Sequence, residues 1–232
     1  MYILGHRGYP KKYTENTLKS FKEAVRLGAD GVELDVWKTE DDVLVISHDE
    51  NLKRVFGVEI HIKKSLFNEI KSKASVPALF EVLEVLPKGK IINIELKDVE
   101  AGDSAVKLVR DYNLSEFVIF SSFEHELIKG LSKVYKGEKF GYLFDERHFN
   151  ITMDTLEDLF SPEEIYSAHI PVELLHYNKD LFFKLADFFK RLHKKIVLWT
   201  VNDKDIINNI PVDYIITDEV EIMVNTFKHG LK

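Results

Sequence analysis

Two acidic residues, Glu33 and Asp35, stand one residue apart in the segment 31–36, whose other large residues are apolar. Side chains alternate between the two faces of a β-strand, so both carboxylates lie on one face and the apolar residues on the other. Two neighbouring carboxylates are unfavourable unless a positive charge lies between them. Because Mg²⁺ and Ca²⁺ prefer oxygen ligands, the pair favours a divalent cation site. The alternative is an edge strand with one polar face in water.

Other polar residues that could do chemistry also follow short apolar segments. They are His6, Arg7, His48, Glu95, Lys97, Ser121 and Trp199. Each stands at the carboxyl end of a predicted strand, and in a parallel barrel those ends share one rim, where such enzymes keep their active sites. Scattered surface charges would not select one end of successive strands. We therefore predict a single site with three carboxylates, two imidazoles and two cationic side chains.

The charged residues of this predicted site suit a metal ion and a phosphate group. Glu33, Asp35 and Glu95 supply hard oxygen ligands for one divalent cation, either Mg²⁺ or Ca²⁺, since selection between the two depends on cavity geometry. Arg7 and Lys97 could hold phosphate oxygens, the arginine as a bidentate donor and the lysine as a point charge. The predicted substrate therefore carries a phosphoryl group.

The two imidazoles would flank the phosphorus atom. His6 and His48 would act as a general base and a general acid, in an order that the sequence leaves open. Trp199 stands where an apolar strand turns polar, so we expect it to form a wall of the site, with a packed core tryptophan as the alternative. His169 also ends a predicted strand and is a further candidate for the rim.

Strand-like and helix-like segments alternate along the whole chain. With the segments 31–36 and 43–46 counted as one strand and its extension, the sequence contains eight strand-then-helix units. Apolar strands that alternate with helices predict a parallel sheet covered on both faces, and eight units close as a (β/α)₈ TIM barrel. We predict an α/β fold with a single domain over residues 1–232. An open doubly wound sheet is the alternative, although no Gly-x-Gly-x-x-Gly follows the first strand.

The composition is that of a soluble globular protein, with 45% hydrophobic and 31% charged residues. The net charge of -7 argues against a nucleic-acid partner, and the absence of cysteine excludes disulfides and thiol chemistry. The N-terminal segment has no basic region before an apolar run, and no segment approaches the roughly 20 apolar residues of a membrane span. We therefore expect no signal peptide, no transmembrane segment and a cytoplasmic location. The sequence leaves the oligomeric state open.

At these residues the sequence resembles the glycerophosphodiester phosphodiesterase family. The matching motifs run in order across almost the whole chain: His6-Arg7-Gly8, Glu15-Asn16-Thr17, Gly28-Ala29-Asp30, Glu33-Leu34-Asp35-Val36, Val45 to His48-Asp49, Val76-Pro77, Glu81-Val82-Leu83, Asn93-Ile94-Glu95-Leu96-Lys97, Ser121-Ser122-Phe123, Trp199-Thr200-Val201-Asn202 and Ile216-Thr217-Asp218. Any one motif is weak, but the ordered set is specific. The resemblance implies a TIM barrel that uses a divalent cation to hydrolyse glycerophosphodiesters to sn-glycerol 3-phosphate and an alcohol.

The resemblance also implies roles for single residues. Its acid–base pair falls on His6 and His48. Its metal ligands fall on Glu33, Asp35 and Glu95, and its phosphate contacts on Arg7 and Lys97. The motif Glu15-Asn16-Thr17 has a second interpretation, in which it does no more than cap the helix that follows.

The sequence departs from the family pattern at three places. Asp42 stands where a turn glycine is usual, and Glu219 where a proline is usual. The stretch 52–57 replaces an Arg-Thr-rich segment. It belongs to a short insertion at about residues 49–75, which in this family helps to shape the alcohol side of the site.

Two other functions remain open at this stage. One is a lysophospholipase D that uses the same site on lysophospholipids, with an apolar rim from Phe56, Phe144 and Phe149. The other is a barrel that binds a phosphodiester without cleaving it. In a purely structural alternative, the rim charges form only a salt-bridge network, but this gives no reason for the paired histidines.

Overall fold

The computed structural model describes residues 1–148 and 151–230. Within these residues one sheet contains β1 (Tyr2–Gly5), β2 (Gly31–Lys38), β3 (Leu44–Ile46), β4 (Ile91–Leu96), β5 (Val118–Ser122), β6 (Phe140–Leu143), β7 (Ile165–Pro171), β8 (Lys195–Trp199) and β9 (Tyr214–Thr217). The order around the sheet is β1-β9-β8-β7-β6-β5-β4-β2-β3, and β1 also pairs with β2. That last pairing closes the sheet into a barrel.

Eight of these strands are parallel to their neighbours around the barrel. The ninth, β3, runs antiparallel to β2 and extends it as a hairpin, with Val36 opposite Ile46. The predicted (β/α)₈ TIM barrel is therefore confirmed, and so is the pairing of the segments around 31–36 and 43–46 as one strand and its extension. The open doubly wound sheet is excluded.

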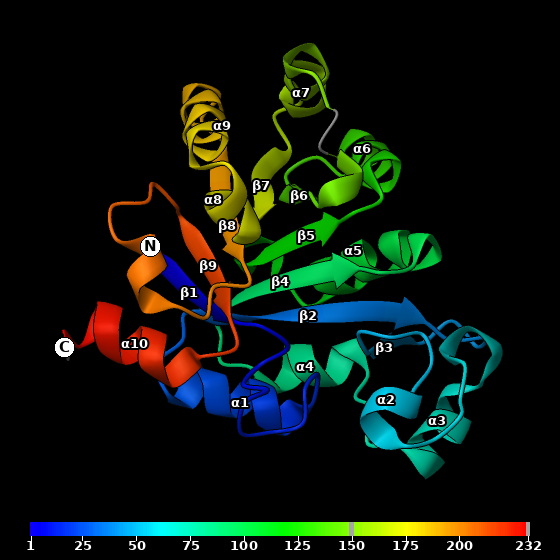
Figure 1. Ribbon diagram of the computed structural model, residues 1–232. Coiled ribbons are helices and arrows are strands. Elements are labelled where there is room, and N and C mark those ends of the chain that lie inside the picture. Colours follow the sequence, from blue (N-terminus) through cyan, green and yellow to red (C-terminus); the bar gives the residue numbers. More distant parts are fainter. Residues whose placement is uncertain (149–150, 231–232) are drawn as a thin grey trace.

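Helices occupy the connections between the strands (Figure 1). They are α1 (Leu18–Arg26), α2 (Lys53–Phe56), α3 (Phe67–Lys73), α4 (Leu79–Val85), α5 (Gly102–Asp111), α6 (His125–Val134), α7 (Met153–Phe160), α8 (Glu173–Tyr177), α9 (Lys179–Arg191) and α10 (Val220–Lys228). Short 3₁₀ turns are η1 (Ile62–Lys64), η2 (Val99–Ala101), η3 (Ser115–Phe117), η4 (Glu146–His148) and η5 (Lys204–Ile207). None of the described helices combines the length and the apolar character that crossing a bilayer requires.

Strand β2 lies inside the sheet, between β1 and β4. Its apolar residues within 31–36 belong to the main core, which also contains Phe21 of α1 and Leu79 of α4. Glu33 and Asp35 take the opposite face and are buried as well, at 3% and 1% exposure. The predicted division of the two faces is confirmed, but the alternative of an exposed edge strand is wrong. The carboxylates point into the barrel.

A second apolar cluster fills the barrel interior. It consists of strand residues only: Leu4, Ile119, Val197, Tyr214 and Ile216. Because side chains alternate along a strand, Leu4 and His6 share the inward face of the first strand. The cluster therefore forms a floor beneath the polar side chains at the carboxyl ends of the strands.

The segment 49–75 forms a small unit beside the barrel, with α2 and α3 set apart from the other helices (Figure 1). Leu52, Ile60, Ile62 and Ile70 make its own apolar core, and Val45 of β3 joins them. Since β3 extends β2, this unit is attached directly to the strand that carries two of the carboxylates.

Candidate active site

A pocket of about 270 Å³ opens at the carboxyl ends of the barrel strands. The described residues that line it are His6, Arg7, Glu33, His48, Asn93, Glu95, Lys97, Phe123, Leu143, Trp199, Thr200 and Ile216. Seven of the nine predicted site residues are among them. Asp35 lies within the same group of carboxylates, and Ser121 is fully buried, with its hydroxyl accepting a hydrogen bond from Asn93 Nδ2 at 3.0 Å. The structure thus brings together residues that are up to 193 positions apart in the sequence, from His6 to Trp199.

The three acids converge as the sequence predicts. One carboxylate oxygen from each of Glu33, Asp35 and Glu95 lies within 4.8 Å of the other two. The strand register explains this, because Asp35 of β2 stands directly opposite Glu95 of β4. Neighbouring strands are about 4.8 Å apart, so oxygens on facing residues can share one ion.

The electrostatics of this cluster favour a cation. Burial, and then repulsion from Asp35, raise the pKa of Glu33 to about 8. The same two causes raise the pKa of Glu95. The Oδ1 atom of Asp35 is buried without a hydrogen-bond partner among residues 1–148 and 151–230. A hard divalent ion would neutralise the repulsion and supply that missing partner, so the donor set fits Mg²⁺ or Ca²⁺.

A tight turn sets the position of Arg7. The amide of Gly8 donates a hydrogen bond to the carbonyl oxygen of Gly5 at 3.1 Å, and a Cβ atom on Gly5 would lie only 2.1 Å from the carbonyl oxygen of Gly8. The backbone amide of Arg7 donates to Glu33 Oε2 at 3.0 Å, while its guanidinium donates to Glu15 Oε1 at 3.0 Å. The glycines on either side of His6 and Arg7 therefore allow the tight turn that brings Arg7 to the carboxylates.

Lys97 is the second cation at the mouth (the carboxyl-end opening of the barrel). Its ammonium group donates to Glu95 Oε1 at 2.8 Å and lies 3.9 Å from Asp35 Oδ1. Burial alone would lower the pKa of Lys97, but these carboxylates outweigh it and raise the pKa. The side chain is therefore charged and could bind an anionic group above the carboxylates.

Each predicted catalytic histidine is paired with an aspartate. His6 Nδ1 lies 2.8 Å from Asp218 Oδ1, and its Nε2 lies 4.0 Å from Glu33 Oε2. His48 Nδ1 lies 2.7 Å from Asp49 Oδ1. Each aspartate fixes the orientation of its imidazole and leaves Nε2 free for another contact.

The two imidazoles differ in their proton affinity. Burial lowers the pKa of His6, but the hydrogen bond that its Nδ1–H donates to Asp218 and the charge of Glu33 outweigh it, so the pKa is raised. Burial lowers the pKa of His48, and the positive charges of Arg7 and Lys97 lower it further. His6 therefore binds a proton more tightly than His48 does.

Aromatic residues wall the pocket. The rings of Trp199 and Phe123 meet edge to face, with their centroids 5.8 Å apart. Phe123 belongs to the motif Ser121-Ser122-Phe123 and directly follows β5, but it was not among the predicted site residues. Two residues suggested for an apolar rim do not line this pocket: Phe56 packs against the small core of the segment 49–75, and Phe144 lines a separate cavity with residues of α7, β7 and α9. The third residue proposed for that rim, Phe149, lies outside the described residues.

His169 does not reach the mouth. It is fully buried, and its Nε2 lies 2.9 Å from Ser167 Oγ. Burial lowers its pKa to about 3, so the imidazole is neutral. The expectation that it could line the rim is therefore wrong.

Asn16 joins the site in a way that the sequence did not reveal. Its side-chain amide donates to Asp35 Oδ2 at 2.8 Å, and it is 2% exposed. Its φ angle of 55° bends the chain just before Thr17, whose hydroxyl accepts from the Ser20 amide and so caps α1. The motif Glu15-Asn16-Thr17 thus caps a helix, as one interpretation had it, and also reaches the carboxylate cluster.

This barrel and this mouth define a class of phosphodiester hydrolase, and comparisons with known proteins agree. Residues 6–222 match the model of the glycerophosphoryl diester phosphodiesterase family. A glycerophosphodiester phosphodiesterase from Caldanaerobacter subterraneus subsp. tengcongensis is 31% identical over 98% of this chain and 98% of its own. The chain therefore belongs to this family and is an enzyme of the glycerophosphodiester phosphodiesterase type.

Solved structures support the same conclusion about the fold. The crystal structure of a glycerophosphodiester phosphodiesterase from Thermotoga maritima has a TM-score of 0.87 and 37% identity, and the match covers 97% of this chain and 98% of that one. A phosphodiesterase from Oleispira antarctica, solved in complex with the product sn-glycerol-3-phosphate, has a TM-score of 0.82 and 23% identity, with 96% and 95% of the two chains covered.

Proposed function

We propose that this enzyme hydrolyses glycerophosphodiesters to sn-glycerol 3-phosphate and an alcohol, with one divalent cation and with His6 and His48 as its acid–base pair. The observation that carries the proposal is the convergence of three carboxylate oxygens within 4.8 Å of one another, in a pocket that both histidines also line. A phosphodiester needs charge neutralisation at its oxygens and proton transfer on both sides of the phosphorus atom. The pocket offers groups for both.

The carboxylates of Glu33, Asp35 and Glu95 would hold the cation. When bound, a divalent cation withdraws charge from phosphoryl oxygens as they become more negative. Both Mg²⁺ and Ca²⁺ suit three carboxylates, so activity with each ion is the measurement that separates them. Arg7 and Lys97 would bind further phosphoryl oxygens and keep the diester in place.

The histidines would move the protons. One imidazole removes a proton from the attacking oxygen as the new P–O bond forms, and the other donates a proton to the alcohol oxygen as the old P–O bond breaks. The attacking oxygen is either water or the 2-hydroxyl group of the glycerol moiety, which would first give a cyclic phosphate. A diester without the 2-hydroxyl group separates the two routes, because only direct attack by water can cleave it.

Release of glycerol 3-phosphate tests the proposal. We expect the purified protein to release it from a water-soluble glycerophosphodiester, EDTA to abolish the release, and added Mg²⁺ or Ca²⁺ to restore it. A panel of alcohol headgroups, assayed with each metal, would also define substrate preference. If metal-loaded protein releases no glycerol 3-phosphate from any member of the panel, the proposal is wrong.

The same panel addresses the alternatives. Faster turnover of a lysophospholipid than of soluble diesters would favour the lysophospholipase D activity. Tight binding in a calorimeter, with the diester recovered uncleaved, would favour a binding barrel, which membership of an enzyme family already disfavours. We further propose that the chain is one domain in which residues 49–75 are an insertion that shapes the alcohol side. The cytoplasmic location stays a prediction.

Asn16→Ala gives a sharper test of the metal site. We expect the metal affinity to fall roughly 10–100-fold, the usual effect of removing a hydrogen bond to a metal ligand, because Asp35 loses its amide donor. Asn113→Ala is the matched control: Asn113 has the same φ of 55° but is exposed and does not line the mouth pocket. Both variants carry the backbone strain of an alanine at positive φ, so equal metal affinities measured by calorimetry would contradict a role for the amide.

A further inference from the structure

A chain of ion pairs runs outside the pocket, along the edge of the mouth, and Arg54 is at its centre. The Nε atom of Arg54 donates to Asp49 Oδ2. On its other side, Nη1 donates to Glu15 Oε2 at 3.0 Å and Nη2 donates to Glu15 Oε1 at 2.7 Å. One guanidinium therefore joins two carboxylates that are 34 positions apart in the sequence.

Both of these carboxylates also hold a residue of the proposed site. The other oxygen of Asp49 lies 2.7 Å from His48 Nδ1. Glu15 Oε1 also accepts a hydrogen bond from Arg7 Nη1 at 3.0 Å. Arg54 thus links the support of an imidazole to the support of a phosphate-binding arginine, without lining the pocket itself.

The segment 49–75 fixes the place of Arg54. It stands on α2, which follows the fully buried Leu52 and is preceded by Asn51, whose side-chain oxygen accepts from the Lys53 amide at 2.9 Å. Gly57 ends the helix with a φ of 72°. The flat, five-donor fork of an arginine can satisfy two carboxylates at once, which the single ammonium of a lysine does less well.

We propose that Arg54 is a positioning residue for the hydrolysis: it holds Asp49 and Glu15 in place, and through them His48 and Arg7. The proposal rests on the function proposed above for those two residues. A solvent-exposed ion pair contributes little to folding, with a median of about 0–1 kcal/mol. Arg54 is 49% exposed, so its loss should leave the fold intact and act on the site.

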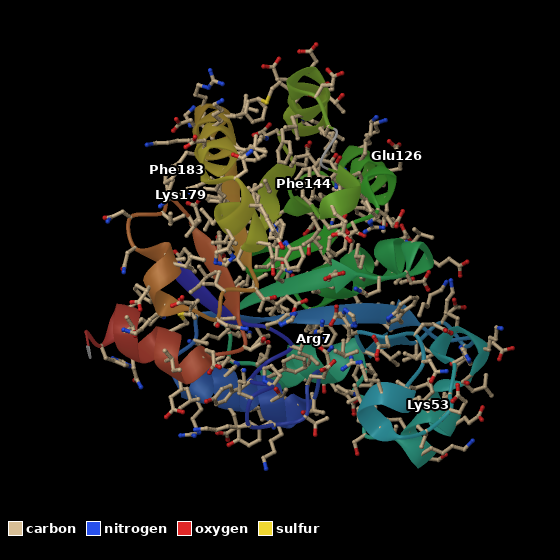
Figure 2. The ribbon with its side chains drawn as sticks, in the orientation of Figure 1. Arg7, Lys53, Glu126, Phe144, Lys179 and Phe183 are labelled. Atoms are coloured by element: carbon tan, nitrogen blue, oxygen red, sulfur yellow. The ribbon has the colours of Figure 1, made fainter. Side chains whose placement is uncertain are left out.

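Arg54→Met tests this, with Lys53→Met as the matched control. Lys53 is the neighbouring residue on the same helix and has the same charge, and its one ion pair within the described residues is with Glu59 at 2.8 Å. Figure 2 shows it on the outlying helix while Arg7 lies near the middle of the molecule. We expect Arg54→Met to lower kcat about 10–100-fold, since small displacements of catalytic groups have effects of this size. We expect Lys53→Met to keep the wild-type kcat, and both melting temperatures to stay within about 2 °C of the wild type.

Two further variants separate bridging geometry from charge. Arg54→Lys keeps the charge but not the fork, so we expect it to recover less than half of the lost kcat. In Arg54→Met combined with Asp49→Asn, we expect a loss well below the product of the two single losses, because both changes break the same link. A wild-type kcat in Arg54→Met, full recovery in Arg54→Lys, or a multiplicative double loss would each overturn the proposal.

Assaying the wild type and His48→Ala alongside these variants distinguishes a failure of the positioning role from a failure of the proposed acid–base function. If the wild type releases glycerol 3-phosphate and His48→Ala does not, a wild-type kcat in Arg54→Met refutes only the positioning role. If His48→Ala is as active as the wild type, the acid–base assignment itself fails.

Discussion

His48→Ala is expected to lower kcat by about 10²–10⁴-fold, the usual contribution of a positioned general acid or base. The imidazole lines the mouth pocket and is held by Asp49, and its side chain is 33% exposed, so truncation should not unfold the barrel. Steady-state release of glycerol 3-phosphate measures the effect. His61→Ala is the control, because His61 lies in the same segment and makes a similar pair with Glu50 at 2.8 Å but is not among the residues that line the mouth pocket.

His6→Ala should lower kcat by a factor of the same order as His48→Ala does. Together the two variants identify which histidine is the general acid. A diester with a nitrophenol leaving group needs less protonation at the departing oxygen. The variant without the general acid should therefore recover much of its rate on that substrate, and the variant without the general base should not. A wild-type rate in either variant, on any diester that the wild type cleaves, would refute the acid–base assignment.

The sequence was sufficient for the parts of this structure that depend on local periodicity. Alternation along 31–36 placed Glu33 and Asp35 on one face, and the position of Glu95 and Lys97 at the end of a later predicted strand placed them at the same rim. In a closed parallel barrel the carboxyl ends of all strands meet, so the topology then brought these faces together. No knowledge of side-chain packing was needed for that step.

The residues that the sequence missed make contacts between distant segments. Asp218 orients His6 across 212 positions, and Arg54 reaches Glu15 across 39. No periodic pattern marks such partners, because they follow from where two loops meet at the mouth. The contact of Asn16 with the carboxylate cluster was not predicted for another reason: a polar residue before a helix already has an adequate explanation as part of a cap.

The aromatic residues that line the pocket could not be selected from the sequence for a similar reason. Phe56 packs against the core of the segment 49–75, while Phe123, which directly follows a predicted strand, lines the pocket. Which of them faces inward depends on the register of β5 and on how the segment 49–75 folds onto β3. Those are tertiary properties, and the local sequence does not fix them.

A divalent cation is expected to stabilise the protein, and by more at about pH 8 than at about pH 5. Without metal, the folded protein holds a proton on Glu33 up to about pH 8, whereas the unfolded chain releases it near the ordinary value of 4.5. The folded state then binds more protons than the unfolded state over that range, so the metal-free stability falls as the pH rises through it. A metal ion must displace this proton, so its affinity rises over the same range.

The melting temperature, with EDTA and with Mg²⁺ or Ca²⁺, measures this linkage. At a metal concentration of about 100 Kd the binding contributes about 2.7 kcal/mol, which corresponds to roughly 5–10 °C for a chain of this size. Glu33→Gln removes both the titrating group and a ligand, so we expect it to flatten the pH dependence of the metal-free protein and to abolish most of the metal-induced shift. Equal melting temperatures with EDTA and with either ion near pH 8 would mean that the three carboxylates do not share a cation, because a filled site must stabilise the state that forms it.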